Sequence, residues 1–489
     1  MNPTSLSQIA SWSGADFISG NPDALVLGVS HDTRTLKPGE LYVALRGERF
    51  DGIHFIKDAL QKGAVGVLYD GVAPSDIPAD FGVLRVADSL QGLTLLARAW
   101  REELGLRAIV LTGSSGKTST KDFTSALLKN FLQITSTRGN FNNHIGLPLS
   151  ILRASKSDQA SVWEVGMNHR GEIAPLAALA KPAIALITNI GTAHIGFLGS
   201  REAIAQEKGD LLAALPPEGV AILPAADDFY EALASRTKVR IFRVGIGVGD
   251  LQATDLVPIA QGMQFQVEYQ GASLPAFLPV IGAHMVHNAL FALAVGLECG
   301  VSLEEGIAVL EKLHPSNNRL KLYEFGGITI VDDAYNANPD SMGAALSAIM
   351  ELKAQRRIGI LGFMGELGDY AATGYQRVGL KAATSLDVLI VVTDETLLLA
   401  ESARDGGMKE VYHVQTNEEA IALVLSMLRP GDLLLVKGSK STHLNEVAEA
   451  VRASLAKQDL AAQGQPVALL NESTTQLSVA SSRLSENSK

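Results

Sequence analysis

Ala108-Ile-Val-Leu-Thr112, followed by Gly113-Ser-Ser-Gly-Lys-Thr-Ser119, is the stretch that decides the fold of this chain. A short apolar strand runs into a glycine-rich loop, and the next residues predict a helix through about Phe131. The glycines let the backbone turn its N–H groups toward an anion, and the start of a helix adds partial positive charge there. The pattern is typical of a phosphate-binding loop, in which Lys117 contacts the outer phosphates and Thr118 ligates Mg²⁺.

This loop departs from the full consensus, because Leu111 stands where that consensus has its first glycine. The shorter Gly-x-x-Gly-Lys-Thr pattern also arises by chance, as a glycine-rich turn that carries an exposed lysine. The strand before the loop and the helix after it favour the phosphate-binding interpretation. On either interpretation we expect Lys117 to be an exposed loop residue.

The segments that follow alternate between strands and helices, which implies mostly parallel sheets with helices on both faces. Strands are predicted at 108–112, 161–165, 183–188, 220–223, 328–331, 358–361, 388–392 and 433–436. Asn338, followed by Pro339, predicts a capped helix start. Because domains usually contain roughly 100–200 residues, the 489 residues predict about three.

We therefore expect an α/β protein with a central phosphate-loop domain and a Rossmann-like C-terminal domain. The expected units are an N-terminal domain at 1–104, the central domain at 105–315, the C-terminal domain at 316–456 and a tail at 457–489. The polar run at 314–319 is interpreted as a linker. The tail is rich in Gln, Ser, Asn and Ala, a composition that predicts disorder.

Composition narrows the class of protein further. Hydrophobic residues make up 47% of the chain, but no apolar run approaches the roughly 20 residues that span a bilayer. The first residues show no basic region followed by an apolar stretch, so no signal peptide is expected. The formal net charge of −11 argues against nucleic-acid binding. Cys299 is the only cysteine, which excludes an internal disulfide and fits a reducing cytoplasm.

Polar side chains that suit a metal follow two further strands. Glu164 ends the strand at 161–165, and His194 follows the strand at 183–188. In open α/β sheets, ligands bind beyond the carboxyl ends of the strands. Mg²⁺ prefers oxygen ligands, so Thr118 and Glu164 suit it. His194 is a less usual ligand, and a capping or hydrogen-bonded histidine is the other interpretation.

Lys208 lies on the apolar face of a predicted helix at 201–215. Its neighbours at helical spacing are Ile204, Leu211, Leu212 and Leu215. Such a lysine can bury its stem and extend its ammonium to water. It can also be a desolvated amine with a lowered pKa that is available for chemistry. Spacing alone leaves both interpretations open.

Together these residues resemble the Mur ligase family, ATP-dependent enzymes that build the peptide stem of bacterial cell-wall precursors. The resemblance runs from about Gly28 to about Val451. Its markers are Thr112-Gly-Ser-Ser-Gly-Lys-Thr118, Gly139-Asn-Phe-Asn-Asn-His-Ile-Gly146, Glu164-Val-Gly-Met-Asn168, His194, Lys208, Gly282-Ala-His-Met-Val-His-Asn288, Val331-Asp-Asp-Ala-Tyr-Asn-Ala-Asn-Pro-Asp340, Gly365-Glu-Leu-Gly368 and Val436-Lys-Gly-Ser439. The last three most resemble the member that joins D-alanyl-D-alanine to UDP-N-acetylmuramoyl-tripeptide.

The resemblance implies roles for individual residues. The implied ATP-binding residues are Thr112, Gly113, Ser114, Ser115, Gly116, Lys117, Thr118, Ser119, Asn288, Arg319 and Asp333, with Asp333 at the ribose. The implied substrate-binding residues are Thr33, Arg34 and Arg46 for the UDP end, and Asn140, Asn142 and Asn143 for the peptide. The implied catalytic residues are Lys117, Glu164, His194 and Lys208. The implied Mg²⁺ ligands are Thr118, Glu164, His194 and a carbamylated Lys208.

The implied activity is ATP-dependent amide-bond formation through an acyl phosphate, with release of ADP, in peptidoglycan precursor synthesis. A cytoplasmic monomer is expected. Three positions depart from the family pattern, namely Met285 where asparagine is frequent, Phe363 where aspartate is common and Tyr375 where histidine is common. They leave details of the nucleotide and dipeptide contacts open.

Other functions fit part of the pattern. A diaminopimelate- or lysine-adding ligase of the same family should carry Asp-Asn-Pro-Arg, which this sequence lacks; a folylpolyglutamate synthase would share the fold. An ordinary phosphate-loop kinase or ATPase leaves the segment 333–340 unexplained. A nucleotide sensor without catalysis would not need Glu164, His194 and Lys208 together.

Overall fold

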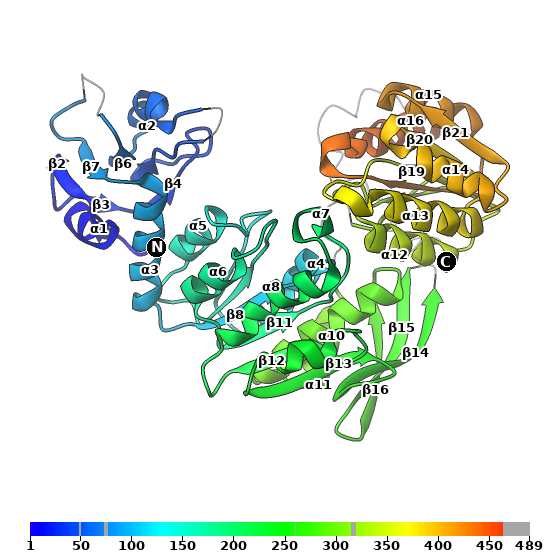
Figure 1. The fold of residues 1–489 in the computed structure, drawn as a ribbon, viewed down its shortest axis with the longest axis horizontal. Helices are drawn as coiled ribbons and strands as arrows, with labels where there is room; N and C mark the ends of the chain where they lie inside the picture. Colours follow the sequence, from blue (N-terminus) through cyan, green and yellow to red (C-terminus); the bar gives the residue numbers. More distant parts are fainter. Residues whose placement is uncertain (48–49, 73–76, 260, 314–318, 463–489) are drawn as a thin grey trace, which may run out of the picture.

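The computed structural model describes residues 1–47, 50–72, 77–259, 261–313 and 319–462, and these form three α/β domains (Figure 1). The predicted fold class is confirmed, because each domain contains a mostly parallel sheet with helices packed against it. Among the described residues, no helix combines the length and apolarity needed to cross a bilayer.

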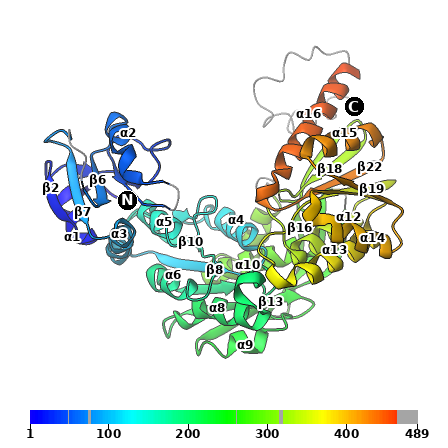
Figure 2. The same ribbon diagram turned by 45° about the horizontal axis from the view of Figure 1, so that its top comes forward.

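The N-terminal domain is built on a sheet with strand order β2-β7-β6-β5-β4, in which only β2 is antiparallel to its neighbour. Its elements are β1 (Thr4–Ser5), α1 (Leu6–Ser13), β2 (Asp16–Ser19), β3 (Leu25–Val26), β4 (Gly28–Ser30), β5 (Glu40–Val43), η1 (Gly52–Phe55), α2 (Ile56–Gln61), β6 (Gly66–Asp70), β7 (Gly82–Val86) and α3 (Ser89–Glu103). Helix α3 leads into the central domain (Figures 1 and 2). Trp100 and Arg101 fix it there by donating to the carbonyls of Ala154 (3.0 Å) and Ala180 (2.8 Å).

The central domain has a sheet with strand order β16-β15-β14-β13-β12-β11-β8-β10-β9. Its strands are β8 (Arg107–Thr112), β9 (Ile134–Ser136), β10 (Ala160–Glu164), β11 (Ile184–Ile187), β12 (Val220–Pro224), β13 (Arg240–Ile246), β14 (Leu251–Ile259), β15 (Gly262–Tyr269) and β16 (Ala272–Leu278). Its helices are α4 (Lys117–Leu128), α5 (Gly146–Arg153), α6 (Ile173–Ala180), α7 (Ile195–Leu198), α8 (Arg201–Ala213), α9 (Tyr230–Ala234), α10 (Ala283–Glu298) and α11 (Leu303–Leu310).

Strand β8 decides where the site of the central domain lies. Its apolar residues are fully buried, as in a strand covered on both faces. It pairs in parallel with β10 on one side and β11 on the other. Because parallel strands end at the same edge of the sheet, the loops after β8, β10 and β11 meet there. Strands β14, β15 and β16, which pair antiparallel at the far edge of the sheet, were not predicted from the sequence.

The C-terminal domain has a sheet with strand order β17-β18-β22-β19-β20-β21, parallel except at β17. Its elements are β17 (Lys321–Phe325), β18 (Ile328–Asp332), α12 (Pro339–Met350), β19 (Arg356–Leu361), η2 (Gly368–Tyr370), α13 (Ala371–Ser385), β20 (Val388–Val392), η3 (Asp394–Thr396), α14 (Leu397–Asp405), β21 (Glu410–Val414), α15 (Asn417–Met427), β22 (Asp432–Lys437), η4 (Lys440–Thr442) and α16 (Leu444–Ala462).

Two local predictions in this domain can be compared with the structure. Helix α12 begins at Pro339, and the Asn338 side chain caps it by accepting from the Ser341 N–H at 2.8 Å, as predicted. Helix α16 continues through Ala462, so the beginning of the expected tail is helical. Residues 463–489, and 314–318 of the expected linker, lie outside the described residues.

Candidate active site

The phosphate loop, Gly113–Gly116, connects β8 to α4 and fits only as glycine at two points. Gly113 and Gly116 have φ angles of +155° and +79°. A Cβ added at Gly113 would lie 1.8 Å from Thr188 Oγ1, and one added at Gly116 would lie 2.5 Å from Asn288 Oδ1. The loop is therefore held against the end of β11 and against α10. The short motif occupies the strand–loop–helix position predicted for it.

Residues after β11 support this loop from one side. The Ser115 N–H donates to Asn189 Oδ1 (2.9 Å), and Thr188 Oγ1 donates to the Ser115 carbonyl (2.6 Å). The Ser114 N–H donates to the Asn189 carbonyl at 3.1 Å. Sequence reasoning assigned no role to Thr188 or Asn189. The signal was their position as the first polar residues after a buried strand.

Lys117 is half-buried, so the prediction of an exposed loop lysine was wrong. Its Nζ donates to the Gly113 carbonyl at 2.7 Å. Burial lowers the pKa of Lys117, while the nearby Glu164 carboxylate opposes that shift. The amine lies inside the site and over the loop, where it can contact an anion.

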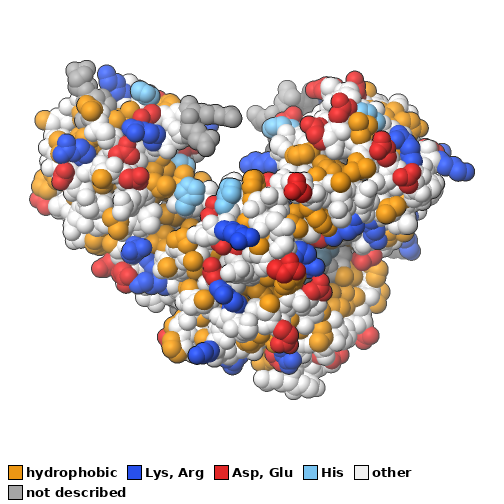
Figure 3. All heavy atoms as spheres, in the orientation of Figure 1, with side chains coloured by type: hydrophobic (Ala, Val, Ile, Leu, Met, Phe, Trp, Pro, Cys, Tyr) orange, Lys and Arg blue, Asp and Glu red, His pale blue; other side chains and the backbone are white. Residues whose placement is uncertain are grey.

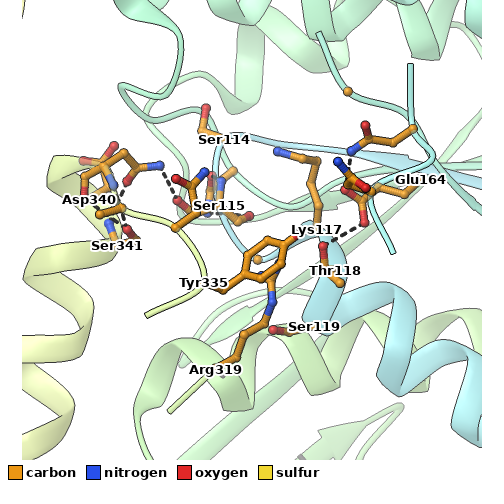
Figure 4. A pocket seen from close by; sticks show the side chains of 18 of the residues that line it. Ser114, Ser115, Lys117, Thr118, Ser119, Glu164, Arg319, Tyr335, Asp340 and Ser341 are labelled. Atoms are coloured by element: carbon orange, nitrogen blue, oxygen red, sulfur yellow. Dashed lines mark hydrogen bonds between the residues drawn. The ribbon is translucent and has the colours of Figure 1, made fainter. Parts of the chain in front are cut away.

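Thr118 and Glu164 lie together, as expected from their positions at adjacent strand ends (Figure 4). Thr118 Oγ1 donates to Glu164 Oε2 at 2.9 Å, and Asn142 Nδ2 donates to Glu164 Oε1 at 2.8 Å. The Glu164 side chain is buried, at 2% exposure. A buried carboxylate bonded only by neutral donors, beside a hydroxyl, provides the oxygen ligands that Mg²⁺ prefers. These residues therefore fit a magnesium ion.

His194 lines the same cavity as Glu164 but has a different partner. Its Nδ1 pairs with the carboxylate of Glu366 from the C-terminal domain. Burial lowers the pKa of His194, Glu366 raises it, and Lys117 and Lys208 lower it further. In the part of the chain that the structure describes, no three His, Cys, Asp or Glu side chains form a ready metal cluster. Glu366 belongs to the quoted motif 365–368, but sequence reasoning gave it no role.

Lys208 is buried on α8, with 1% of its surface exposed, beside the fully buried Ile204 and Leu211. Of the two interpretations that the sequence left open, this burial favours the desolvated amine over one that extends to water. Within the described residues, its ammonium makes no hydrogen bond or ion pair. Burial lowers the pKa of Lys208 well below 10.5, the Lys117 charge lowers it further, and Glu207 opposes the shift. Burial therefore favours the neutral amine relative to the ammonium at this position.

A cavity of about 530 Å³ joins the central and C-terminal domains. From the central domain it is lined by the phosphate loop, the segments 140–144 and 164–168, His194 and the start of α10. The C-terminal domain contributes Arg319, Asp333, Tyr335 and the start of α12. The Arg319 guanidinium lies 4.6 Å from the Tyr335 ring centre (Figure 4). Asp333 pairs with Lys437 at 2.6 Å.

Most of the predicted nucleotide residues thus line one cavity with Asn140, Asn142 and Asn143, whereas Thr112, Gly113 and Lys208 are not among its lining residues. Tyr335 and Lys437 belong to the quoted motifs, but sequence reasoning did not assign them. Two departures from the family pattern have local partners: Asn288 Nδ2 lies 3.6 Å from Met285 Sδ, and the Tyr375 hydroxyl accepts from the Met364 N–H at 3.0 Å.

Thr33, Arg34 and Arg46 lie on the N-terminal domain and do not line this cavity. Arg34 pairs with Asp32 at 2.7 Å and lowers the pKa of that carboxyl to about 2. Arg46 pairs with Asp51 at 3.0 Å. The His31 ring meets Phe141 edge-on at 5.9 Å, beside the Asn142 that bonds to Glu164. Figure 3 shows a face hollowed between the N-terminal and C-terminal domains.

Comparison with known families gives the class of this protein. The middle domain of Mur ligases matches residues 111–296, the glutamate ligase domain of Mur ligases matches 318–440, and the catalytic domain of the Mur ligase family matches 26–101. The chain belongs to the Mur ligase family.

Its relatives point to one branch of that family. UDP-N-acetylmuramoyl-tripeptide–D-alanyl-D-alanine ligase from Bacillus subtilis is 36% identical over 429 residues, covering 86% of this chain and 92% of the relative. The Escherichia coli enzyme of the same name is 33% identical, over 88% of this chain and 94% of the relative. Among solved structures, MurF from Acinetobacter baumannii has a TM-score of 0.83 at 32% identity, covering 92% of this chain and 98% of that one. MurF from Thermotoga maritima in complex with ADP has a TM-score of 0.79 at 26% identity, covering 88% of this chain and 98% of that one.

Proposed function

We propose that this chain is an ATP-dependent ligase that joins D-alanyl-D-alanine to UDP-N-acetylmuramoyl-tripeptide, a step of bacterial peptidoglycan precursor synthesis. The observation that carries the proposal is the cavity in which a phosphate loop faces the 333–341 segment of the C-terminal domain. The relatives of known name, at 33–38% identity over most of the chain, support the same reaction.

The chemistry must first make a carboxylate reactive, because a carboxylate cannot expel oxide. Its oxygen attacks the γ-phosphorus of ATP, the bond to the bridging oxygen breaks, and ADP leaves with that electron pair. The acyl phosphate then has a good leaving group. The unprotonated amine of D-alanyl-D-alanine attacks the carbonyl, and the tetrahedral intermediate collapses to an amide and phosphate, with release of a proton. Lys117 neutralises negative charge on the phosphoryl group in the transition state of its transfer.

We propose Mg²⁺ as the metal, held by Thr118 and Glu164, with His194 and a carbamylated Lys208 as further ligands. The hydrogen bond between Thr118 and Glu164 and the costly burial of the Lys208 amine support this set. Bound Mg²⁺ would supply positive charge opposite the phosphate oxygens.

The proposed ATP site consists of residues 112–119 with Asn288, Arg319 and Asp333. Asn140, Asn142 and Asn143 face the peptide, and Asn142 is already bonded to Glu164 at 2.8 Å. Thr33, Arg34 and Arg46 bind the UDP end of the substrate. This distribution fits a long substrate that crosses from the N-terminal domain to the phosphate loop.

The proposed domain boundaries fall near residues 104, 315 and 456. We also propose a monomer that works in the cytoplasm. The free thiol of Cys299 fits a reducing compartment.

The test is ADP release by the purified chain with each substrate withheld in turn. We expect release to require both the UDP-sugar tripeptide and D-alanyl-D-alanine, with tripeptides ending in meso-diaminopimelate and in L-lysine supplied in parallel. L-lysine, meso-diaminopimelate and glutamate serve as control amines. Comparable turnover with one of these controls would move the enzyme to another branch of its family.

A further inference from the structure

Asp340, at the start of α12, reaches across to a loop of the central domain. Its Oδ2 accepts two hydrogen bonds from Thr192, one from the backbone N–H (2.6 Å) and one from Oγ1 (2.8 Å). Its Oδ1 accepts from the Arg377 guanidinium on α13. Thr192 is 2% exposed. The buried donors of Thr192 are thus satisfied by another domain.

The loop that carries Thr192 fits tightly between the phosphate loop and α12. A Cβ added at Gly191 would lie 2.4 Å from Asp340 Oδ2 and 3.3 Å from Ser114 Cβ. The Gly191 N–H donates to Ser114 Oγ at 2.8 Å. Figure 4 shows Asp340 and Ser341 on the side of the cavity where Ser114 and Ser115 lie. If Asp340 moved away, the loop would therefore lose its packing contact on the side of α12.

The neighbouring part of the loop is anchored within the central domain itself. The Ile190 N–H donates to Asp227 (2.8 Å), and its carbonyl accepts from Arg201 (2.8 Å). Thr192 is different, because Asp340 is the partner of its N–H and its hydroxyl. His194 follows two residues later and pairs with Glu366, also of the C-terminal domain. Both contacts would be lost if the C-terminal domain moved away.

Asn338, two residues before Asp340, contacts the phosphate loop directly. Asn338 Nδ2 donates to Ser115 Oγ at 3.3 Å. Hydrogen bonds to a charged group are directional and stronger than neutral ones. The start of α12 thus connects the docked position of the C-terminal domain to two loops of the reaction site.

We propose that Asp340 is a positioning residue. By accepting hydrogen bonds from Thr192 it fixes the position of the 189–194 loop, which carries His194 and supports the phosphate loop. Phosphoryl transfer is therefore fast only while the C-terminal domain is docked. The inference rests on the proposed ligase function and deepens it. An acidic residue in the first turn also stabilises a helix by itself, but that effect would not depend on Thr192.

The test compares Asp340→Asn, Thr192→Val, the double variant and wild type in the complete reaction. Thr192→Val keeps the side-chain shape and removes one hydrogen bond, so we expect kcat to fall roughly fivefold. Asp340→Asn removes the charge, and we expect a fall of roughly tenfold or more. KM for the UDP-sugar tripeptide should stay within twofold of wild type, because that substrate is held mainly by the other domains.

Two features separate positioning from mere stability. Thr192→Ser retains both donors and should restore kcat to near wild type. The kcat of the double variant should be only slightly lower than that of Asp340→Asn alone, because the two substitutions disrupt the same contact. The matched control is Asp369→Asn, an exposed aspartate of the same domain, which should leave kcat and the thermal midpoint unchanged.

Wild-type values of kcat for both Asp340→Asn and Thr192→Val would overturn the proposal, as would losses that simply multiply in the double variant. If Asp340→Asn does not fold, the comparison of Thr192→Val with Thr192→Ser decides. A wild-type chain that forms no amide product at all would instead contradict the proposed function.

Discussion

The side-chain amine of Lys208 lies in a buried position, where a charged ammonium is energetically unfavourable. It is 1% exposed, and its pKa is lowered by burial first and by the Lys117 charge second. A neutral amine adds CO₂ and loses a proton, which gives a carbamate with two oxygens and one negative charge. Those oxygens are hard donors of the kind that Mg²⁺ prefers. Burial thus favours the chemistry that would turn this lysine into a metal ligand.

We expect Lys208→Ala to be nearly inactive and small carboxylates to restore part of its activity by entering the vacated space. Lys208→Arg should be inactive, because guanidinium keeps its charge and cannot be carbamylated. Lys208→Met is the matched control, since it fills the space without an amine and should not be rescued. Steady-state rates, together with native mass spectrometry of the wild type for an added CO₂, check this. An active Lys208→Arg enzyme would rule out the carbamate.

At the scale of elements, the site depends on β8 lying between β10 and β11. Parallel pairing brings the end of each strand to one edge, so Thr118 and Glu164 meet at 2.9 Å although 46 residues separate them. His194 reaches the same cavity from the loop after β11. The three residues thus come from three neighbouring strand ends.

This arrangement predicts that Glu164→Ala and His194→Ala each raise the Mg²⁺ concentration that gives half-maximal activity. We expect the larger effect, on the order of tenfold, for Glu164, because its loss removes a charged ligand. Titrating Mg²⁺ at saturating substrates measures it. Glu172→Ala, which removes a half-buried carboxylate that lines another part of the same cavity, is the control. Mg²⁺ dependence like that of wild type in both test variants would contradict the metal assignment.

Local patterns in the sequence were enough to predict β8, β10, β11, the capped start of α12 and the face of α8 that carries Lys208. Each of these signals lies within about twenty consecutive residues. The partners of Asp340 and Glu366 lie in a different domain, and Thr192 is separated from Asp340 by 148 positions in the sequence. No local pattern encodes such a contact. The exposure of Lys117 was misjudged for the same reason, because residues of distant segments, among them Asn288 and Arg319, line the same cavity as Lys117.

At the scale of the whole molecule, two partly buried histidines make stability depend on pH. His284 and His287 lie at the start of α10, and burial lowers the pKa of each to about 4. An unfolded histidine has a pKa near 6.5. Between these values the unfolded chain binds more protons than the folded one, so stability falls as the pH drops from about 6.5 to about 4.

We expect His287→Gln to flatten this dependence. The change in slope is at most about 1.4 kcal/mol per pH unit, and smaller because the ring keeps some contact with solvent. Thermal midpoints of wild type and variant, compared from pH 7 down to pH 4.5, measure it. His54→Gln, at an exposed position of the N-terminal domain, is the control and should follow wild type. Equal pH dependence in His287→Gln would show that the pKa of this histidine is the same in the folded and the unfolded protein.

The proposed reaction joins two substrates through an acyl phosphate that is made from ATP. Its most direct test uses UDP-N-acetylmuramoyl-tripeptide with ¹⁸O in the reacting carboxylate, together with ATP and D-alanyl-D-alanine. An acyl phosphate transfers one carboxylate oxygen to the departing phosphate. We therefore predict that mass spectrometry will find the pentapeptide product and one ¹⁸O in the inorganic phosphate released with it. Absence of the pentapeptide, or a pentapeptide formed with unlabelled phosphate, would contradict the account.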